Sequence, residues 1–170
     1  MKIVLINIEG CSSIFFSFMQ EMLAESGHEC KYLHIPIGGL GDIDKGSLKQ
    51  IVSELKLFCK GAGLIGFSCM TNTFIGFKKI AVELKSLGIP IVVGGIHPTV
   101  RPDECLDYAD YVCVGEGEKP LLELVEKLEK KNPTEKKKNL YMKKNGKVIR
   151  NDLGPIIKDL DTLPVPTFNL

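Results

Sequence analysis

Residues 89–99 read Ile-Pro-Ile-Val-Val-Gly-Gly-Ile-His-Pro-Thr, an apolar run that leads into two adjacent glycines. The β-branched residues predict a buried strand at 89–93. Because glycine has no Cβ, two glycines at the carboxyl end of a strand allow a flat or bulky ligand to lie against the backbone. A second glycine turn, Gly-Glu-Gly-Glu at 115–118, follows another short apolar run at 110–114. Together the two turns predict the rim of a ligand-binding site.

The sequence on both sides of this stretch alternates between short apolar runs and segments with helical spacing. This alternation predicts an α/β fold, a flavodoxin-like (Rossmann-like) doubly wound five-stranded parallel sheet of order 2-1-3-4-5 with right-handed crossovers. The expected strands are residues 2–8, 29–35, 63–68, 89–93 and 110–114, and the expected helices are residues 12–27, 47–60, 73–87, 102–108 and 119–131.

The strand order also predicts where a ligand binds. The chain reverses direction between the first and third strands, and ligands of such sheets bind outside the carboxyl ends of the strands at that point. The expected rim therefore consists of residues 7–13, 68–73, 94–99 and 115–118.

The character of the sequence changes after residue 132. Asn145-Gly146 lies between two apolar segments, which predicts a two-residue β-hairpin. The proline-containing segment 159–166 is typical of a linker. We therefore expect an α/β domain at 1–132, and a C-terminal hairpin and interdomain linker at 133–170 leading to a further domain absent from this sequence.

Composition narrows the class of protein. The chain has 170 residues, 44% of them hydrophobic and 25% charged, as in an ordinary globular domain, and its net charge of +1 gives no reason to expect nucleic acid. Ten of the 22 Lys and Arg residues lie between Lys127 and Arg150, which we interpret as a solvated helix end and a polar hairpin. No secretory signal or membrane span is recognised, so we expect a cytoplasmic protein without a membrane partner.

Several motifs are assigned structural roles. The six cysteines contain no Cys-x-x-Cys pair and are interpreted as buried apolar residues, so no metal site is predicted. Residues 61–66 match Gly-x-Gly-x-x-Gly, but these glycines precede a strand instead of following one, so we reject a dinucleotide site. Among the polar residues after the third strand, Ser68 is the favoured ligand contact, whereas Thr71 or Thr73 is the favoured cap of the following helix. Residues 97–99 are expected to form a turn at the rim.

The assembled rim resembles the N-terminal cobalamin-binding domain of radical S-adenosylmethionine enzymes, the group of anaerobic Mg-protoporphyrin IX monomethyl ester oxidative cyclase-like proteins and cobalamin-dependent methylases. The resemblance is carried by residues 94–99, 102–104 and 110–118, the Asn-Gly hairpin and residues 160–166. In the wider cobalamin-domain group, a Ser-x-Leu and a Gly-Gly line the channel for the dimethylbenzimidazole tail, and Ser68-Cys69-Met70 and Gly94-Gly95 look like their counterparts.

The resemblance implies that cobalamin is the cofactor. The cofactor-binding residues that it implies, together with the rim, are Asn7, Gly10, Cys11, Ser12, Ser68, Met70, Thr71, Gly94, Gly95, His97, Gly115, Glu116 and Gly117. Cobalamin domains with an axial histidine have Asp-x-His-x-x-Gly after the first strand, whereas residues 7–12 here contain no His. The resemblance thus implies a base-off cofactor with no protein histidine on cobalt.

The chain also lacks the Cys-x-x-x-Cys-x-x-Cys spacing of radical enzymes. We therefore expect no catalytic residue in it, and expect the 4Fe-4S cluster and S-adenosylmethionine to belong to a C-terminal radical S-adenosylmethionine domain of a longer protein. Methyl transfer and oxidative cyclisation both remain open as the reaction.

Two other functions stay as alternatives. A degenerate domain would bind no corrinoid and act as a scaffold or substrate-docking domain. A flavin or receiver-type domain is less favoured, because Ser68 occupies the position of the receiver's acidic residue and only Ser12 and Ser13 supply hydroxyls for a flavin phosphate. For the cobalamin site we expect leucine at Gly94 or Gly95 to abolish binding while the fold stays intact.

Overall fold

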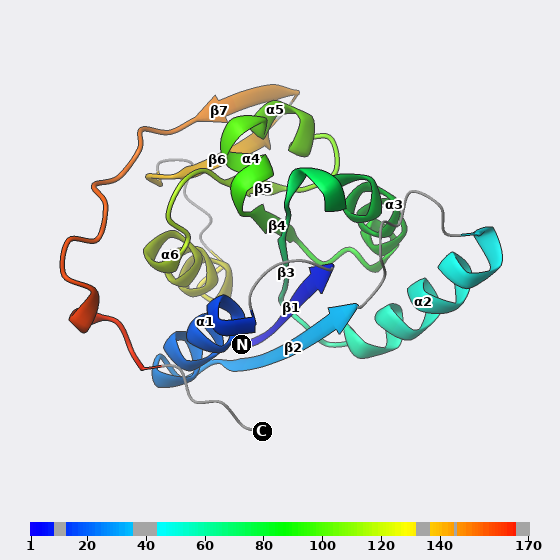
Figure 1. The fold of residues 1–170 in the computed structure, drawn as a ribbon, viewed down its shortest axis with the longest axis horizontal. Coiled ribbons are helices and arrows are strands. Elements are labelled where there is room, and N and C mark those ends of the chain that lie inside the picture. Colours follow the sequence, from blue (N-terminus) through cyan, green and yellow to red (C-terminus); the bar gives the residue numbers. More distant parts are fainter. Residues whose placement is uncertain (9–12, 36–43, 132–136, 145, 166–170) are drawn as a thin grey trace.

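Five parallel strands form the centre of the computed structural model, which describes residues 1–8, 13–35, 44–131, 137–144 and 146–165 (Figure 1). They pair in the order β2-β1-β3-β4-β5, which confirms the predicted doubly wound α/β class and strand order. The strands are β1 (Lys2–Ile8), β2 (Glu29–Ile35), β3 (Leu64–Ser68), β4 (Ile91–Gly94) and β5 (Tyr111–Cys113).

The predicted hairpin continues the same sheet. Its strands β6 (Leu140–Lys144) and β7 (Lys147–Arg150) are antiparallel, and β6 also pairs antiparallel with β5, so the sheet has seven strands. Leu140 is fully buried opposite Cys113. The hairpin therefore adds apolar side chains to the core instead of standing apart from it.

Helices cover both faces of the sheet. They are α1 (Ser13–Glu25), α2 (Lys45–Phe58), α3 (Phe74–Leu84), α4 (Ile96–Val100), α5 (Pro102–Cys105) and α6 (Glu118–Glu129), with 3₁₀ turns η1 (Thr71–Thr73), η2 (Lys85–Leu87) and η3 (Leu160–Thr162). Residues 96–100 form a short helix where the sequence predicted a rim turn. Pro98 fits there because it lies in the first helical turn, where its missing N–H removes no helical hydrogen bond.

The strand alternation divides the core into two layers. Leu5 and Val92 face α1 and α6, where they pack with Phe16 and Leu121. On the opposite face, Val4 and Ile65 belong to a cluster with residues of α2 and α3. Figure 1 shows α1 and α6 on one side of the sheet and α2 and α3 on the other. None of the helices in the described ranges is long and apolar enough to span a bilayer.

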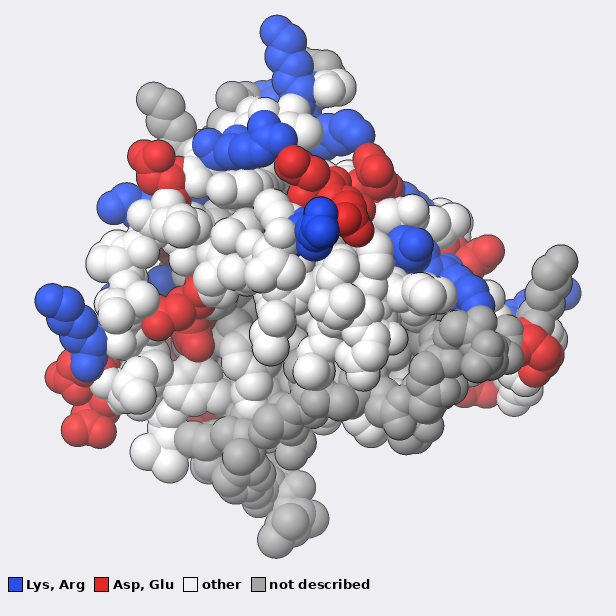
Figure 2. Space-filling model, turned by 45° about the horizontal axis from the view of Figure 1, so that its top comes forward, with Lys and Arg blue, Asp and Glu red and all other residues white. Residues whose placement is uncertain are grey.

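The basic hairpin is partly neutralised by acidic neighbours. Arg150 Nη2 lies 2.9 Å from both carboxylate oxygens of Asp103, and Lys143 Nζ lies 3.1 Å from Asp107 Oδ1. Figure 2 shows side chains of both charges interspersed on the face drawn there. Acidic and basic side chains therefore partly neutralise one another on that face.

The aromatic cluster under α3 gives a test of the core. Phe77 is 1% exposed and its ring lies 5.2 Å from Phe67 and 6.5 Å from Tyr108, centroid to centroid. We expect Phe77→Ala to lower the free energy of unfolding by about 3 to 5 kcal/mol, because it leaves a cavity in a packed layer. Urea denaturation measures this. Leu57→Ala on the exposed side of α2 is the control, with an expected change below about 0.5 kcal/mol.

Candidate functional site

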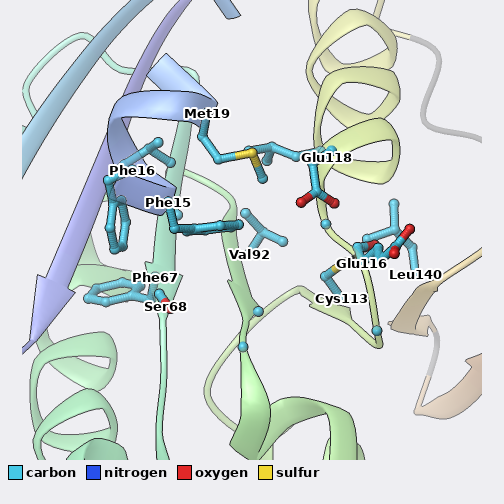
Figure 3. A pocket seen from close by; sticks show the side chains of 17 residues that line it. Phe15, Phe16, Met19, Phe67, Ser68, Val92, Cys113, Glu116, Glu118 and Leu140 are labelled. Atoms are coloured by element: carbon cyan, nitrogen blue, oxygen red, sulfur yellow. Dashed lines mark hydrogen bonds between the residues drawn. The ribbon is translucent and has the colours of Figure 1, made fainter. Parts of the chain in front are cut away.

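A cavity of about 340 Å³ lies between α1 and α6 at the carboxyl edge of the sheet (Figure 3). This volume is within the range of roughly 300 to 1,000 Å³ that is usual for small-molecule sites. Most of the lining is apolar or glycine. The lining residues are Leu5, Phe15, Phe16, Met19, Gly66, Phe67, Ser68, Val92, Gly94, Gly95, Cys113, Gly115, Glu116, Gly117, Glu118, Leu121 and Leu140.

The cavity floor is formed by small residues that the strand register places side by side. Gly66 pairs with Leu5 and Val92, and two residues further along Ser68 pairs with Gly94. Successive side chains alternate between the faces of a strand, so Gly66, Ser68 and Gly94 all belong to the α1 and α6 face. Larger residues at these positions would fill the space beneath the two helices.

Aromatic and sulfur-containing side chains form the α1 wall. Phe16 is buried and stacks on Tyr32 of β2, with ring centroids 4.8 Å apart and planes inclined by 30°. Phe15 is 38% exposed at the opening, and Met19 is buried deeper along the same wall. These side chains present flat apolar surface to an occupant of the cavity.

Gly94 and Gly95 have different structural roles. A Cβ on Gly94 would meet Cys113 Cβ at 3.5 Å, which is an ordinary contact. Gly95 has φ +109°, and a Cβ there would lie 2.7 Å from the backbone oxygen of Cys69. The expectation that leucine at either glycine preserves the fold is therefore wrong for Gly95, where the backbone itself excludes a side chain.

Thr99 joins the two glycine turns. Its hydroxyl donates to the Gly95 carbonyl oxygen at 2.8 Å and accepts from the Gly115 N–H at 3.0 Å. Gly115 has φ +80°, a conformation that favours glycine. The turns after β4 and β5 are thus linked directly at the edge of the cavity.

Asn139 ties the second glycine turn to the chain after the hairpin. Its Nδ2 donates to the Glu116 carbonyl oxygen at 3.2 Å, and its Oδ1 accepts from the Gly154 N–H. The Glu116 carboxylate in turn accepts from the Ile157 N–H at 2.7 Å. We call Asn139, Glu116 and residues 152–157 the clasp. Through these bonds the clasp supports one side of the cavity.

The structure brings about half of the predicted site residues to the cavity. Ser68, Gly94, Gly95, Gly115, Glu116 and Gly117 line it. The predicted residues Asn7, Met70, Thr71 and His97 do not line it. The predicted residues Gly10, Cys11 and Ser12 lie outside the described residues.

His97 and Asn7 make contacts within the protein and do not line the cavity. His97 is 5% exposed and packs on Phe74 with ring centroids 4.0 Å apart, and its Nδ1 lies 3.3 Å from Thr71 Oγ1. Burial lowers the pKa of His97, against the raising effect of Glu104.

Asn7 Nδ2 lies 3.4 Å from the Tyr32 hydroxyl and 3.3 Å from His34 Nδ1. Thr73, one of the two predicted caps, accepts from the Met70 N–H at 3.0 Å.

Sequence reasoning missed the apolar wall and Gly66 as lining residues. A signal for Gly66 existed, because a glycine inside a buried strand often marks a place where a ligand or another backbone comes close. Gly66 also lies two residues before Ser68, so the two residues belong to the same face of the sheet. Phe15, Phe16 and Met19 gave no such signal, because their spacing also suits an ordinary core helix. Glu118 belongs to the rim predicted at 115–118, and it lines the cavity.

The thiol of Cys113 belongs to the cavity lining and is buried. Burial, with a smaller effect of Glu118, raises the pKa of Cys113 to about 12. The protonated thiol donates weakly to the Glu116 carbonyl oxygen at 3.6 Å. Across the part of the chain that the structure describes, no group of three or more His, Cys, Asp or Glu side chains is arranged to hold a metal ion.

Comparison with known proteins supplies a family. A family model described as the B12 binding domain matches residues 1–125. A curated relative, the "Uncharacterized methyltransferase PH0819" of Pyrococcus horikoshii, is 31% identical over 113 residues, which are 63% of this chain and 24% of that protein. The aligned part therefore spans about a quarter of the relative's length.

Solved structures show the same fold. TsrM, a radical S-adenosylmethionine methyltransferase from Kitasatospora setae solved with cobalamin and a 4Fe-4S cluster, matches with TM-score 0.71 and 18% identity over 96% of this chain and 31% of that one. OxsB, a cobalamin-dependent S-adenosylmethionine radical enzyme solved with aqua-cobalamin and S-adenosylmethionine, matches with TM-score 0.73 and 16% identity over 97% of this chain and 24% of that one.

The clasp leads to a prediction about stability. We expect Asn139→Ala to lower the free energy of unfolding by about 2 kcal/mol or more, because two side-chain hydrogen bonds are lost and alanine must adopt φ +63°. Asn139→Gly removes the same bonds without the backbone strain and should lose less. Urea denaturation separates the variants, and faster hydrogen exchange at Gly154 and Ile157 should accompany both. Unchanged hydrogen exchange at Gly154 and Ile157 would contradict a stabilising role of the clasp.

Proposed function

The chain belongs to the B12-binding domain family, and from this premise we propose that it binds cobalamin with the nucleotide base of the cofactor in the cavity between α1 and α6. The observation that supports this placement is the cavity itself. It is open at the carboxyl edge of the sheet, floored by Gly66, Ser68 and Gly94, and walled by the aromatic side chains of α1.

The residues present fit an aromatic base. The floor has no bulky side chain, and Phe15, Phe16 and Met19 offer apolar surface to a flat ring. Burying about 150 Å² of such a ring contributes about 4 kcal/mol at roughly 25 cal/mol per Å². This gross contribution makes steric access to the cavity the main determinant of affinity.

Placing the base in the cavity has a consequence for cobalt. A base held between α1 and α6 does not coordinate the metal, so we propose a base-off cofactor. Residues 7–12, at the end of the first strand, contain no histidine, and we propose that no protein histidine takes the axial position. The chain's own contribution is then to hold the tail and to orient the corrin over the edge of the sheet.

We further propose that the chain is one module of a longer cytoplasmic enzyme. When bound, cobalamin supplies a cobalt centre capable of methyl transfer or redox chemistry. Residues 1–132 would hold it together with Leu140 of the hairpin, and residues 133–170 would lead to a C-terminal radical S-adenosylmethionine domain carrying the 4Fe-4S cluster. The small share of TsrM and OxsB that this chain covers supports a larger parent.

The direct test is cofactor retention. The chain is incubated with hydroxocobalamin and, separately, with flavin mononucleotide, then desalted, and the visible spectrum is recorded. We expect a corrinoid spectrum at about one equivalent and no retained flavin. No retained chromophore would contradict the proposal and favour the scaffold domain, and retained flavin alone would favour a flavin domain.

The cavity floor supplies a sharper test. We expect Gly94→Leu to reduce cobalamin retention by at least about tenfold, because the side chain enters the space proposed for the base. Its far-UV circular dichroism should match the wild type. Gly94→Ala, whose Cβ makes only an ordinary contact with Cys113, is the graded control. Full retention by Gly94→Leu would exclude this placement of the base.

Gly95→Leu should behave differently. The close approach to the Cys69 backbone predicts a loss of stability in the absence of any ligand. A lowered thermal midpoint for Gly95→Leu, beside an unchanged one for Gly94→Ala, would separate the folding role of Gly95 from the lining role of Gly94.

A further inference from the structure

One polar atom at the cavity has no partner in the protein. Oε2 of Glu118 is buried, and no donor within the described ranges forms a hydrogen bond with it. Figure 3 shows the Glu118 carboxylate pointing from the start of α6 toward the space between Met19 and Cys113. The positive end of the helix favours a negative side chain at this position. That effect explains the residue type but supplies no donor to Oε2.

The described side chains next to the Glu118 carboxylate supply no donor. Met19 and Leu121 have no N–H or O–H group. The Cys113 thiol donates to the Glu116 carbonyl oxygen instead. The Glu116 carboxylate provides a contrast, since it accepts from the Ile157 N–H in the clasp. Buried acceptors in folded proteins are nearly always satisfied, so the donor for Glu118 is expected from an occupant of the cavity.

The occupant's chemistry follows from that requirement. An aromatic base offers flat apolar surface, whereas the ribose attached to it offers hydroxyl donors. Carboxylates recognise ribose hydroxyls at the switch point of other doubly wound sheets. We propose that Glu118 accepts a hydrogen bond from a ribose hydroxyl of the cofactor's nucleotide tail, and so favours complete corrinoids over corrinoids that lack the nucleotide. This inference rests on the proposed function.

The experiment compares two ligands that differ in the tail. Affinities for hydroxocobalamin and for cobinamide, which has the corrin but no nucleotide, are measured by absorbance titration of the full chain. We expect Glu118→Leu to weaken hydroxocobalamin binding by about tenfold or more and cobinamide binding by less than about twofold. Glu118→Gln keeps an acceptor oxygen and nearly the same shape, so it should lose less. Glu126→Leu, at an exposed position of the same helix, is the matched control.

The outcomes separate the two proposals. Equal weakening of both ligands by Glu118→Leu, or no weakening of either, overturns the role of Glu118 while wild-type cobalamin binding still supports the proposed function. Failure of the wild type to bind either corrinoid overturns the proposed function and this inference with it. If Glu118→Leu loses its far-UV spectrum, the ligand comparison is made with Glu118→Ala, which also removes the acceptor, and an unchanged ratio of the hydroxocobalamin and cobinamide affinities overturns the inference.

Discussion

The cavity depends on the register between β1, β3 and β4. That register aligns Leu5, Gly66 and Val92 in one row across the sheet, and Asn7, Ser68 and Gly94 in the next row toward the carboxyl edge. Because these residues share one face, the small ones leave a hollow beneath α1 and α6. A one-residue shift of β3 would bring Phe67 onto this face and remove the hollow. The hydrogen-bonded ladder of the sheet is thus the primary determinant of the site.

The edge of the cavity is held by the backbone as much as by side chains. Gly95 passes so close to Cys69 that no side chain fits, and this approach positions α4 directly after β4. Thr99 on α4 then bonds to Gly95 and Gly115 and so links the turns after two neighbouring strands. His97, which occupies the same helix, turns to the other side of the sheet and packs on Phe74. The short helix α4 therefore contributes Thr99 to the cavity edge and His97 to the core on the opposite face of the sheet.

The C-terminal segment also contributes to the site. The hairpin extends the sheet next to β5 and brings Leu140 to the cavity. Asn139, immediately before it, adopts φ +63° and bonds both to the glycine turn after β5 and to the segment after β7. The path by which the chain leaves the sheet is consequently coupled by hydrogen bonds to residues that line the cavity. The departing chain bonds directly to two lining residues, to the Glu116 carboxylate through the Ile157 N–H and to the Leu140 carbonyl oxygen through Asn151 Nδ2.

The sequence by itself determined the strands, their order and the edge at which the glycine turns meet, because hydrophobic periodicity and right-handed crossovers leave few arrangements for such a pattern. It also identified Ser68, Gly94 and the 115–117 turn as neighbours. Only the tertiary structure decided that Gly66 belongs with them, that Gly95 serves the fold, and that His97 lies outside the cavity. These outcomes depend on contacts between residues far apart in the chain, such as Gly95 with Cys69 and Asn139 with Gly154, and local spacing carries no information about such distances.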